Sequence, residues 1–302
     1  DELEALIERA NLSIADCNHD EDLLRQRARK AQVILDEQAR AAPPPSRRTI
    51  AGYECIVKRT RVCNDGADLA IVALHGFDAT FAELEDLPQQ LFEQDAALRG
   101  RSLLFVLPQA PTTPVGAAWW GYDSNRFRDG VTMDKRAIES FVHEEPAGLA
   151  ECRERMGRLI AEVRRMAGGI PSARVLLVGY SHGAPTAMDI ALQRDPAEAV
   201  AGVAFLSGVP IAVEQWKKRL RVHPRLRALL THGAMDMSLP IAAGGYVRDL
   251  LSSAGADVSF VPHNGGHELG GRPVHAALAD LTNELIARGT ATTRHERESA
   301  PR

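Results

Sequence analysis

One stretch near the middle of the chain, residues 174–184, constrains the fold more than any other. An apolar run of strand length leads into a Gly-x-Ser-x-Gly turn with Ser181 at its centre, and residues with helical spacing follow. Strand, tight turn and helix form the setting of a nucleophile elbow, whose glycines are needed because a side chain there would collide with neighbouring backbone. The first N–H groups of the helix then point at the space above the serine, which suits a developing oxyanion. Taken alone, the pentapeptide also fits an ordinary glycine turn, since the chain contains 24 Gly.

On both sides of this stretch, apolar runs alternate with segments of helical spacing. Residues 69–74 form a continuous apolar run, which is typical of a strand buried on both faces. Strands separated by helices favour a mostly parallel, doubly wound α/β sheet with helices on both faces. The predicted strands are 50–58 (an edge strand), 69–74, 103–107, 174–178, 200–206, 227–231 and 257–261, and the predicted helices end at 94 or span 151–166, 186–192, 246–253 and 274–287.

The chain is predicted to have three parts. Residues 1–48 are a charged helical arm ending in a proline-rich linker, 49–289 are the α/β domain, and 290–302 are a polar, loose tail. Two apolar faces, separated by a polar break, predict helices in the arm. We favour packing of residues 1–42 on the domain surface over the alternative, an arm that contacts a partner or a second copy of the chain.

Composition and charge limit which binding partners and which cellular location can be expected. The 302 residues are 45% hydrophobic and 25% charged with a net charge of −4, which gives no reason to expect binding to nucleic acid or anionic membranes. No apolar run is long enough to span a bilayer. The acidic start favours a cytoplasmic location over secretion, with a leader removed before Asp1 left open. The four cysteines, Cys17, Cys55, Cys63 and Cys152, are too few and too scattered for a disulfide scaffold or a zinc site. Cys55 and Cys63 could meet across a hairpin, but we expect reduced thiols.

Chemistry-bearing residues follow four of the predicted strands. Catalytic groups of such sheets gather at the carboxyl ends of the strands. His75 follows the first buried strand, Ser181 follows the elbow strand, and Asp236 and His267 lie just beyond later strands. A serine hydrolase needs a nucleophile, a base and an acid that orients the base, and in a hydrolase sheet they come in the order Ser, Asp, His. Ser181, Asp236 and His267 satisfy this order.

Other assignments are weaker. His263 is a rival base but directly follows its strand, and Asp249 and Asp257 are rival acids on the wrong side of their helix or strand. No pair of histidines has helical ligand spacing with a carboxylate as third partner, so neither a metal nor another cofactor is expected. We expect His75 and His232 to hold loops through hydrogen bonds.

The chain resembles the α/β-hydrolases of the phospholipase/carboxylesterase and acyl-protein thioesterase type, close to the dienelactone-hydrolase-like group. The resemblance covers residues 50–288 and rests on six motifs in the order of that family. They are His75-Gly76, Pro108-Gln109-Ala110-Pro111, Trp119-Trp120, the Gly-x-Ser-x-Gly of 179–183, His232 to Asp236, and Gly266-His267.

This resemblance implies an α/β-hydrolase fold and a role for each matched residue. Ser181 would attack an acyl carbonyl, His267 would take its proton and pass it to the leaving group, and Asp236 would hold the tautomer of His267. The backbone N–H groups of His182 and Phe77 would form the oxyanion hole.

Two departures from the family pattern border the acyl site. The thioesterases usually carry Gln where this chain has His182, and small residues where it has Phe77-Asp78. The substrate preference of the family is therefore not transferable. Residues 121–146 resemble an insertion and are either a plain surface loop or a partial lid that reads a substrate carboxylate or phosphate. The candidate substrate-binding residues are Trp119, Trp120, Tyr122, Leu269 and, in this segment, Arg126 and Arg128.

The expected function is that of a serine hydrolase acting on small-molecule carboxylic esters or thioesters with short to medium acyl chains. An acyltransferase or cyclising thioesterase would use the same three residues, so sequence does not separate it from a hydrolase. A non-catalytic binding module with a hydrolase-like fold is a further alternative, although such a module has no need for all three residues.

Overall fold

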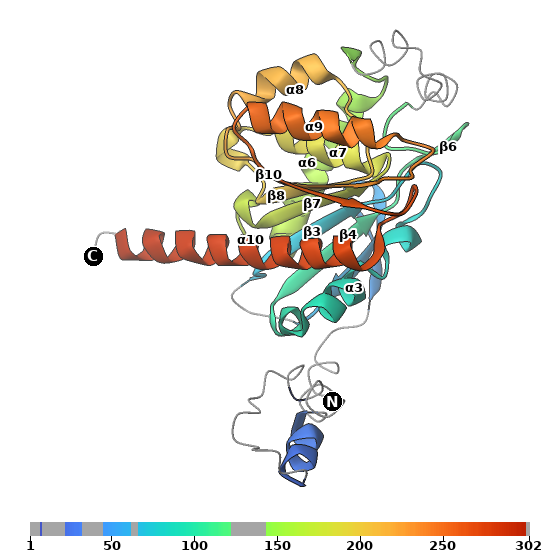
Figure 1. The fold of residues 1–302 in the computed structure, drawn as a ribbon. Helices are drawn as coiled ribbons and strands as arrows, with labels where there is room; N and C mark the ends of the chain where they lie inside the picture. Colours follow the sequence, from blue (N-terminus) through green and yellow to red (C-terminus); the bar gives the residue numbers. More distant parts are fainter. Residues whose placement is uncertain (1–6, 8–21, 32–44, 62–65, 122–142, 300–302) are drawn as a thin grey trace.

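A computed structural model describes residues 7, 22–31, 45–61, 66–121 and 143–299. Its centre is an eight-stranded sheet in the order β1-β2-β4-β3-β7-β8-β9-β10 (Figure 1). β2 pairs antiparallel with β1 and β4, and the remaining neighbours are parallel. The strands are β1 (Ser46–Ile50), β2 (Tyr53–Arg59), β3 (Leu69–Leu74), β4 (Leu103–Pro108), β7 (Val175–Tyr180), β8 (Gly202–Leu206), β9 (Arg227–Gly233) and β10 (Asp257–His263), with a separate pair β5 (Thr112–Thr113) and β6 (Gly116–Ala117).

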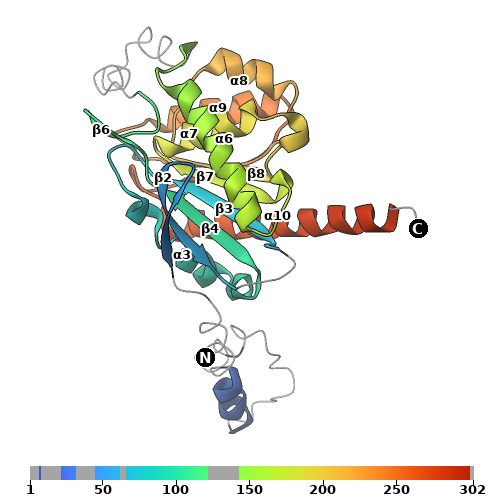
Figure 2. The same ribbon diagram turned by 180° about the vertical axis from the view of Figure 1, so that it is seen from behind.

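Helices cover both faces of the sheet, as the two opposite views show (Figures 1 and 2). One hydrophobic cluster takes side chains from α6 (Leu149–Met166), α7 (Gly183–Gln193), α8 (Val213–Leu220) and α9 (Ile241–Ser253). The cluster on the other face takes them from α3 (Leu87–Gln94) and α10 (Gly271–Ser299). The predicted fold class is confirmed. Short 3-10 helices are η1 (Phe81–Leu84), η2 (Ala96–Gly100), η3 (Ser172–Arg174) and η4 (Pro196–Glu198).

Strand β3 shows how alternation sorts side chains between the two faces. All its residues are buried, as its continuous apolar run predicts. Successive side chains point to opposite faces, so alternate residues join different clusters. Ala70, Val72 and Leu74 belong to one, and Leu69, Ile71 and Ala73 to the other. Parallel pairing places Leu74 opposite Gly179, which brings the end of β3 beside the elbow.

Three elements differ from the sequence prediction. The predicted edge strand 50–58 is a hairpin of β1 and β2, joined by Ala51 and Gly52 with φ of 50° and 82°, a two-residue turn that matches strand twist. Helix α8 lies where no helix was predicted. Helix α10 continues to Ser299, so the predicted boundary at 289–290 falls inside a helix whose end projects beyond the sheet (Figure 1). Gly289 alone costs a helix about 1 kcal/mol, and no proline interrupts residues 274–299.

The predicted N-terminal arm is described only in part. Residues 22–31 form a helix within it. Residue 7 and residues 45–48 of this part are also described, and β1 begins at Ser46, before the predicted boundary at 48–49. Residues 1–6, 8–21 and 32–44 lie outside the described residues.

Candidate active site

The elbow between β7 and α7 has the backbone that its glycines predict. Ser181 has a φ of 53°, a strained value for a residue with a Cβ, and its N–H donates to the carbonyl oxygen of Leu206 on β8 (2.9 Å). A Cβ on Gly179 would collide with the backbone of Gly183, and a Cβ on Gly183 with the carbonyl group of Leu74. Both glycines are therefore required by the close approach of these backbone segments.

Three side chains from separate loops at the carboxyl edge of the sheet are joined by short hydrogen bonds. Ser181 Oγ lies 2.8 Å from His267 Nε2, and His267 Nδ1 lies 2.7 Å from Asp236 Oδ2. The His267 side chain is 23% exposed, whereas the Asp236 carboxylate is fully enclosed. The Tyr180 ring lies 5.4 Å from the His267 ring, and its O–H donates to the His267 carbonyl oxygen (2.9 Å). The structure thus brings together the three residues that the order of motifs had selected.

The Asp236 carboxylate is fixed by its own turn. Its Oδ1 accepts the N–H groups of Ser238 (2.8 Å) and Leu239 (2.7 Å), which leaves Oδ2 to His267. His232 on β9 is fully buried, and burial lowers its pKa, which favours the neutral ring. Its Nε2 lies 2.7 Å from the carbonyl oxygen of Leu239 and donates to it. His232 therefore closes the turn that holds the acid.

The rival base His263 occupies another position. It is the last residue of β10 and is buried, and its Nδ1 accepts the N–H of Gly265 (3.2 Å). It is His267 Nε2, not His263, that accepts a hydrogen bond from the Ser181 hydroxyl.

His75, just after β3, orients the peptide that follows it. The Ala110 N–H donates to His75 Nε2 (3.0 Å), so the ring proton is on Nδ1, which donates to the Gly76 carbonyl oxygen (2.8 Å). Burial lowers the pKa of His75 and favours this neutral form. Because the peptide is planar and trans, the N–H of Phe77 points away from that carbonyl. Ala110 belongs to the Pro-x-Ala-Pro segment, which thus holds His75 in place.

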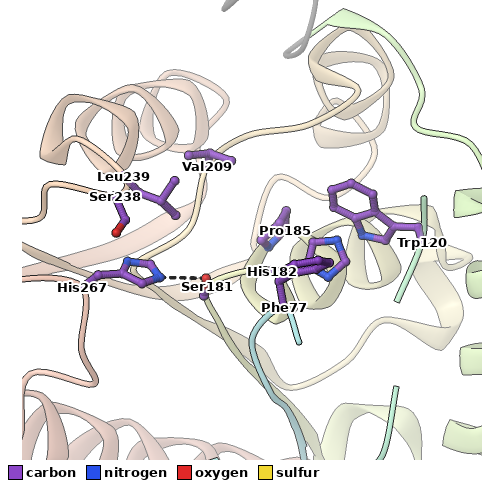
Figure 3. Close-up of a pocket in the computed structure, with 9 residues that line it drawn as sticks. All are labelled: Phe77, Trp120, Ser181, His182, Pro185, Val209, Ser238, Leu239 and His267. Atoms are coloured by element: carbon purple, nitrogen blue, oxygen red, sulfur yellow. Dashed lines mark hydrogen bonds between the residues drawn. The ribbon is translucent and has the colours of Figure 1, made fainter. Parts of the chain in front are cut away.

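A cavity of about 210 Å³ opens beside Ser181. In Figure 3, Ser181 lies between His267 and a group formed by Phe77, His182 and Trp120. These five predicted residues line the cavity together with four that sequence reasoning missed: Pro185, Val209, Ser238 and Leu239. Nearness to the serine and the acid in sequence could have suggested three of the four, whereas the loop after β8 carries no motif that points to Val209.

His182 is enclosed by aromatic side chains. Its ring centroid lies 4.0 Å from that of Trp120 and 6.1 Å from that of Phe77. The Trp120 indole N–H donates to Thr186 Oγ1 (2.9 Å), and this hydroxyl donates to the His182 carbonyl oxygen (2.8 Å). Burial, with a smaller contribution from His75, lowers the pKa of His182 to about 3. At neutral pH the ring therefore adds an uncharged wall to the cavity.

The other predicted substrate-binding residues are not among those that line the cavity. Trp119 is buried against the rings of Tyr53 and His75, and its indole N–H donates to the His75 carbonyl oxygen (2.8 Å). Leu269 packs against the cluster on the face of α3 and α10. Tyr122, Arg126 and Arg128, with most of the segment 121–146, lie outside the described residues.

Within the described part of the chain, no group of three or more His, Cys, Asp and Glu side chains could hold a metal ion. None of the described helices is both long and apolar enough to cross a bilayer. Cys55 and Cys152 are buried free thiols, whereas Cys17 and Cys63 fall outside the described ranges.

The mostly parallel sheet with a serine elbow at its carboxyl edge defines an α/β-hydrolase. Solved structures share this fold at low sequence identity. Esterase PE8 is 22% identical over 73% of this chain and 94% of its own, with a TM-score of 0.57. Arabidopsis thaliana SOBER1 is 19% identical over 72% and 99%, with a TM-score of 0.55. A carboxylesterase from Mesorhizobium loti is 17% identical over 79% and 98%, with a TM-score of 0.57.

The sequence itself identifies the family. The family model described as phospholipase/carboxylesterase matches residues 67–283. The chain therefore belongs to the phospholipase/carboxylesterase family and is a hydrolase of the carboxylesterase type, as the motifs predicted. No curated protein matches the chain.

Acid should destabilise the protein in part through His182. The unfolded residue has a pKa of about 6.5, and burial lowers the folded value to about 3. As the pH falls, the unfolded chain therefore binds a proton at this residue before the folded protein does. The contribution of His182 to the free energy of unfolding is complete above about pH 6.5 and falls by up to about 1.4 kcal/mol per pH unit towards pH 3. Urea unfolding measures the free energy of unfolding at pH 7.5 and at pH 5.0. Its decrease between these two pH values should be about 2 kcal/mol smaller in His182→Gln than in wild type.

His143→Gln is the matched control, because the His143 side chain is 44% exposed. It should lose at least as much stability as wild type on acidification, because it also gives up an exposed pair with Glu214 at 3.4 Å, which is worth little. Burial lowers the pKa of His75 and of His232 as well, and both residues remain in all three proteins. Equal acid losses in wild type and His182→Gln would contradict the assignment.

Proposed function

We propose that this chain hydrolyses carboxylic esters or thioesters with short to medium acyl chains through an acyl-enzyme on Ser181. The observation that carries the proposal is the hydrogen-bonded chain from Ser181 Oγ through His267 to Asp236, at 2.8 and 2.7 Å. A serine hydroxyl is a weak nucleophile unless an oriented base can take its proton, and these distances suit that transfer.

In the acylation step, Ser181 Oγ attacks the acyl carbonyl carbon while His267 Nε2 takes the hydroxyl proton. The tetrahedral intermediate then expels the alcohol or thiol, which receives this proton from His267. In the second step, water gives a proton to His267 and attacks the acyl-enzyme, so the acid is released and Ser181 regains its proton. Asp236 keeps the imidazole tautomer and stabilises the imidazolium formed in both steps.

Two backbone N–H groups are proposed to stabilise the oxyanion. The Phe77 N–H is a candidate because the Gly76 carbonyl, which points the opposite way, is held by His75. The His182 N–H is the second, because His182 is the N-cap of α7, where the helix dipole favours negative charge.

The cavity beside the serine supports a compact acyl group. Its wall is mostly apolar, with Phe77, Trp120, Val209 and Leu239 among its members, and its volume is about 210 Å³. A neutral His182 adds no charge to this wall. We therefore infer that the cavity takes the acyl chain.

A panel of p-nitrophenyl esters from acetate to palmitate should show kcat/KM rising to short or medium chains and then levelling off. Each methylene that enters the cavity should add at most about 0.8 kcal/mol, roughly fourfold in kcat/KM. The matching thioesters, assayed through the released thiol, compare the two substrate classes. Adding an alcohol or amine acceptor separates hydrolysis from acyl transfer, which uses the same residues.

Val209→Phe provides a sharper version of the panel. The larger side chain should partly fill the cavity and move the optimum to shorter chains, whereas Val222→Phe, at a position 46% exposed, should leave it unchanged. A steady rise to palmitate would contradict the compact acyl group. If the panel is inert while Ser181 still reacts with a fluorophosphonate, a specific substrate recognised through Arg126 or Arg128 becomes the better assignment.

A further inference from the structure

A second carboxylate reaches the loop beside the nucleophile. Glu83 belongs to the short helix η1 and is exposed as a residue, but its carboxylate is turned inward. Its Oε2 accepts the N–H of Gly76 at 2.7 Å. Nothing in the sequence motifs singled out this residue.

The position of Gly76 shows how close this carboxylate is to the nucleophile. A Cβ placed on Gly76 would lie 3.3 Å from Glu83 Oε2 and 3.3 Å from Ser181 Cβ. Both distances are shorter than ordinary van der Waals contact, so a side chain at this position would require the carboxylate or the serine to shift.

The same carboxylate is also near the base, because the space beside Gly76 touches both Glu83 Oε2 and Ser181 Cβ, and Ser181 Oγ lies 2.8 Å from His267 Nε2. Burial of the carboxylate raises the pKa of Glu83, and both the Gly76 N–H and the charge that His267 can carry lower it. A negative charge near an imidazole favours its protonated form. The other titratable groups around His267 are Asp236 on its Nδ1, Tyr180 and His232, with Glu268 and His263 next to these.

We infer that Glu83 is a positioning residue of the hydrolytic site, which holds the oxyanion loop through Gly76 and adds a second negative charge near His267. This inference rests on the proposed function. The peptides on either side of Gly76 are then both fixed, since Glu83 accepts the Gly76 N–H and His75 donates to the Gly76 carbonyl oxygen. The direction of the Phe77 N–H follows from the second of these peptides.

Two substitutions separate the hydrogen bond that Glu83 makes to Gly76 from the effect of its negative charge on His267. Glu83→Gln keeps an oxygen that can accept the Gly76 N–H but removes the charge, whereas Glu83→Ala removes both. Glu85→Gln is the matched control, because Glu85 lies two residues further along and pairs with Lys58 at 3.4 Å. Circular dichroism and melting curves check that each variant is folded.

The readouts are the rate of Ser181 labelling by a fluorophosphonate and kcat and KM for p-nitrophenyl acetate, each from pH 5 to 9. Glu83→Gln should keep its plateau rate within about threefold of wild type, while its acid limb moves to lower pH by roughly 0.3 to 0.5 unit. Glu83→Ala should show the same move and a further loss of about tenfold in kcat and labelling rate with KM little changed, because a misplaced oxyanion donor weakens transition-state stabilisation. Glu85→Gln should match wild type in both.

The outcomes are distinct. If Glu83→Ala and Glu83→Gln have the same plateau rate, Glu83 does not hold the loop. If the acid limb of the pH profile moves no further in Glu83→Gln than in Glu85→Gln, the charge of Glu83 does not act on His267. This comparison does not need Glu83→Ala and stands even if that variant does not fold. Activity that survives in Ser181→Ala overturns the proposed function itself, whereas a serine-dependent enzyme indifferent to Glu83 overturns only this inference.

Discussion

Ser181→Ala should lower kcat for ester hydrolysis by about 10⁶-fold and leave the fold unchanged. The large effect follows from the site: Ser181 Oγ is the atom held at 2.8 Å from His267 Nε2. The left-handed backbone at position 181 tolerates alanine about as well as serine, because both carry a Cβ. Steady-state kinetics on p-nitrophenyl acetate and a melting curve measure the two parts of this prediction.

Ser207→Ala is the matched control for this substitution. Ser207 follows the neighbouring strand β8 and also has a left-handed backbone, with a φ of 50°. It should retain activity within about tenfold of wild type, as its hydroxyl has no part in the proposed chemistry. Activity within tenfold of wild type in Ser181→Ala would remove that residue from the mechanism.

His267→Ala should be as damaging as Ser181→Ala, and the double variant should be little worse than either. Nucleophile and base act as one unit, so removing the second costs almost nothing once the first is gone. Wild-type activity should rise with pH through the range in which a histidine loses its proton, because the base must start neutral. Kinetics of the two single variants and the double variant from pH 5 to 9 provide the measurement.

His263→Ala tests the assignment of the base. His263 is buried at the end of β10, only four positions before His267, and its Nδ1 accepts the N–H of Gly265. Its replacement should cost some stability but leave most of the activity of the folded protein. A dead but folded His263→Ala with an active His267→Ala would reverse the assignment.

Local patterns were enough to predict the frame of the site. Gly179 and Gly183 are visible in sequence because the elbow leaves no room for a side chain, and this is a property of a few consecutive residues. The strands that lead to Ser181 and Asp236 were visible because they are buried and largely apolar. Strand β10, which leads to His267, lies at the edge of the sheet and is only partly buried. The order of the family motifs then indicated which residue after each strand belongs to the site.

The lining of the cavity could not be predicted in the same way. Val209 reaches the cavity from the loop after β8, a position that depends on how the strands order themselves in the sheet. Adjacent residues can also diverge, as Trp120 lines the cavity while Trp119 packs on His75. Glu83 was missed because its partner is a backbone N–H, which leaves no trace in a side-chain motif.

Element ends were the least predictable part of the fold. The turn at Ala51 and Gly52 was read as part of one strand, because alternation continues on both sides of it. Helix α8 is short and buries Val213, Trp216 and Leu220, and the indole N–H of Trp216 donates to Asp189 on α7 (2.9 Å). Such long-range contacts override local propensity.

Reaction of the protein with a fluorophosphonate, followed by tryptic digestion and mass spectrometry, tests the central claim most directly. Cleavage after Arg174 and Arg194 releases residues 175–194, in which Ser181 is the only serine. The account predicts one adduct per chain, located on Ser181, absent from Ser181→Ala and formed far more slowly in His267→Ala. An active wild-type protein with no adduct on Ser181, or with its adduct on another residue, would contradict the account.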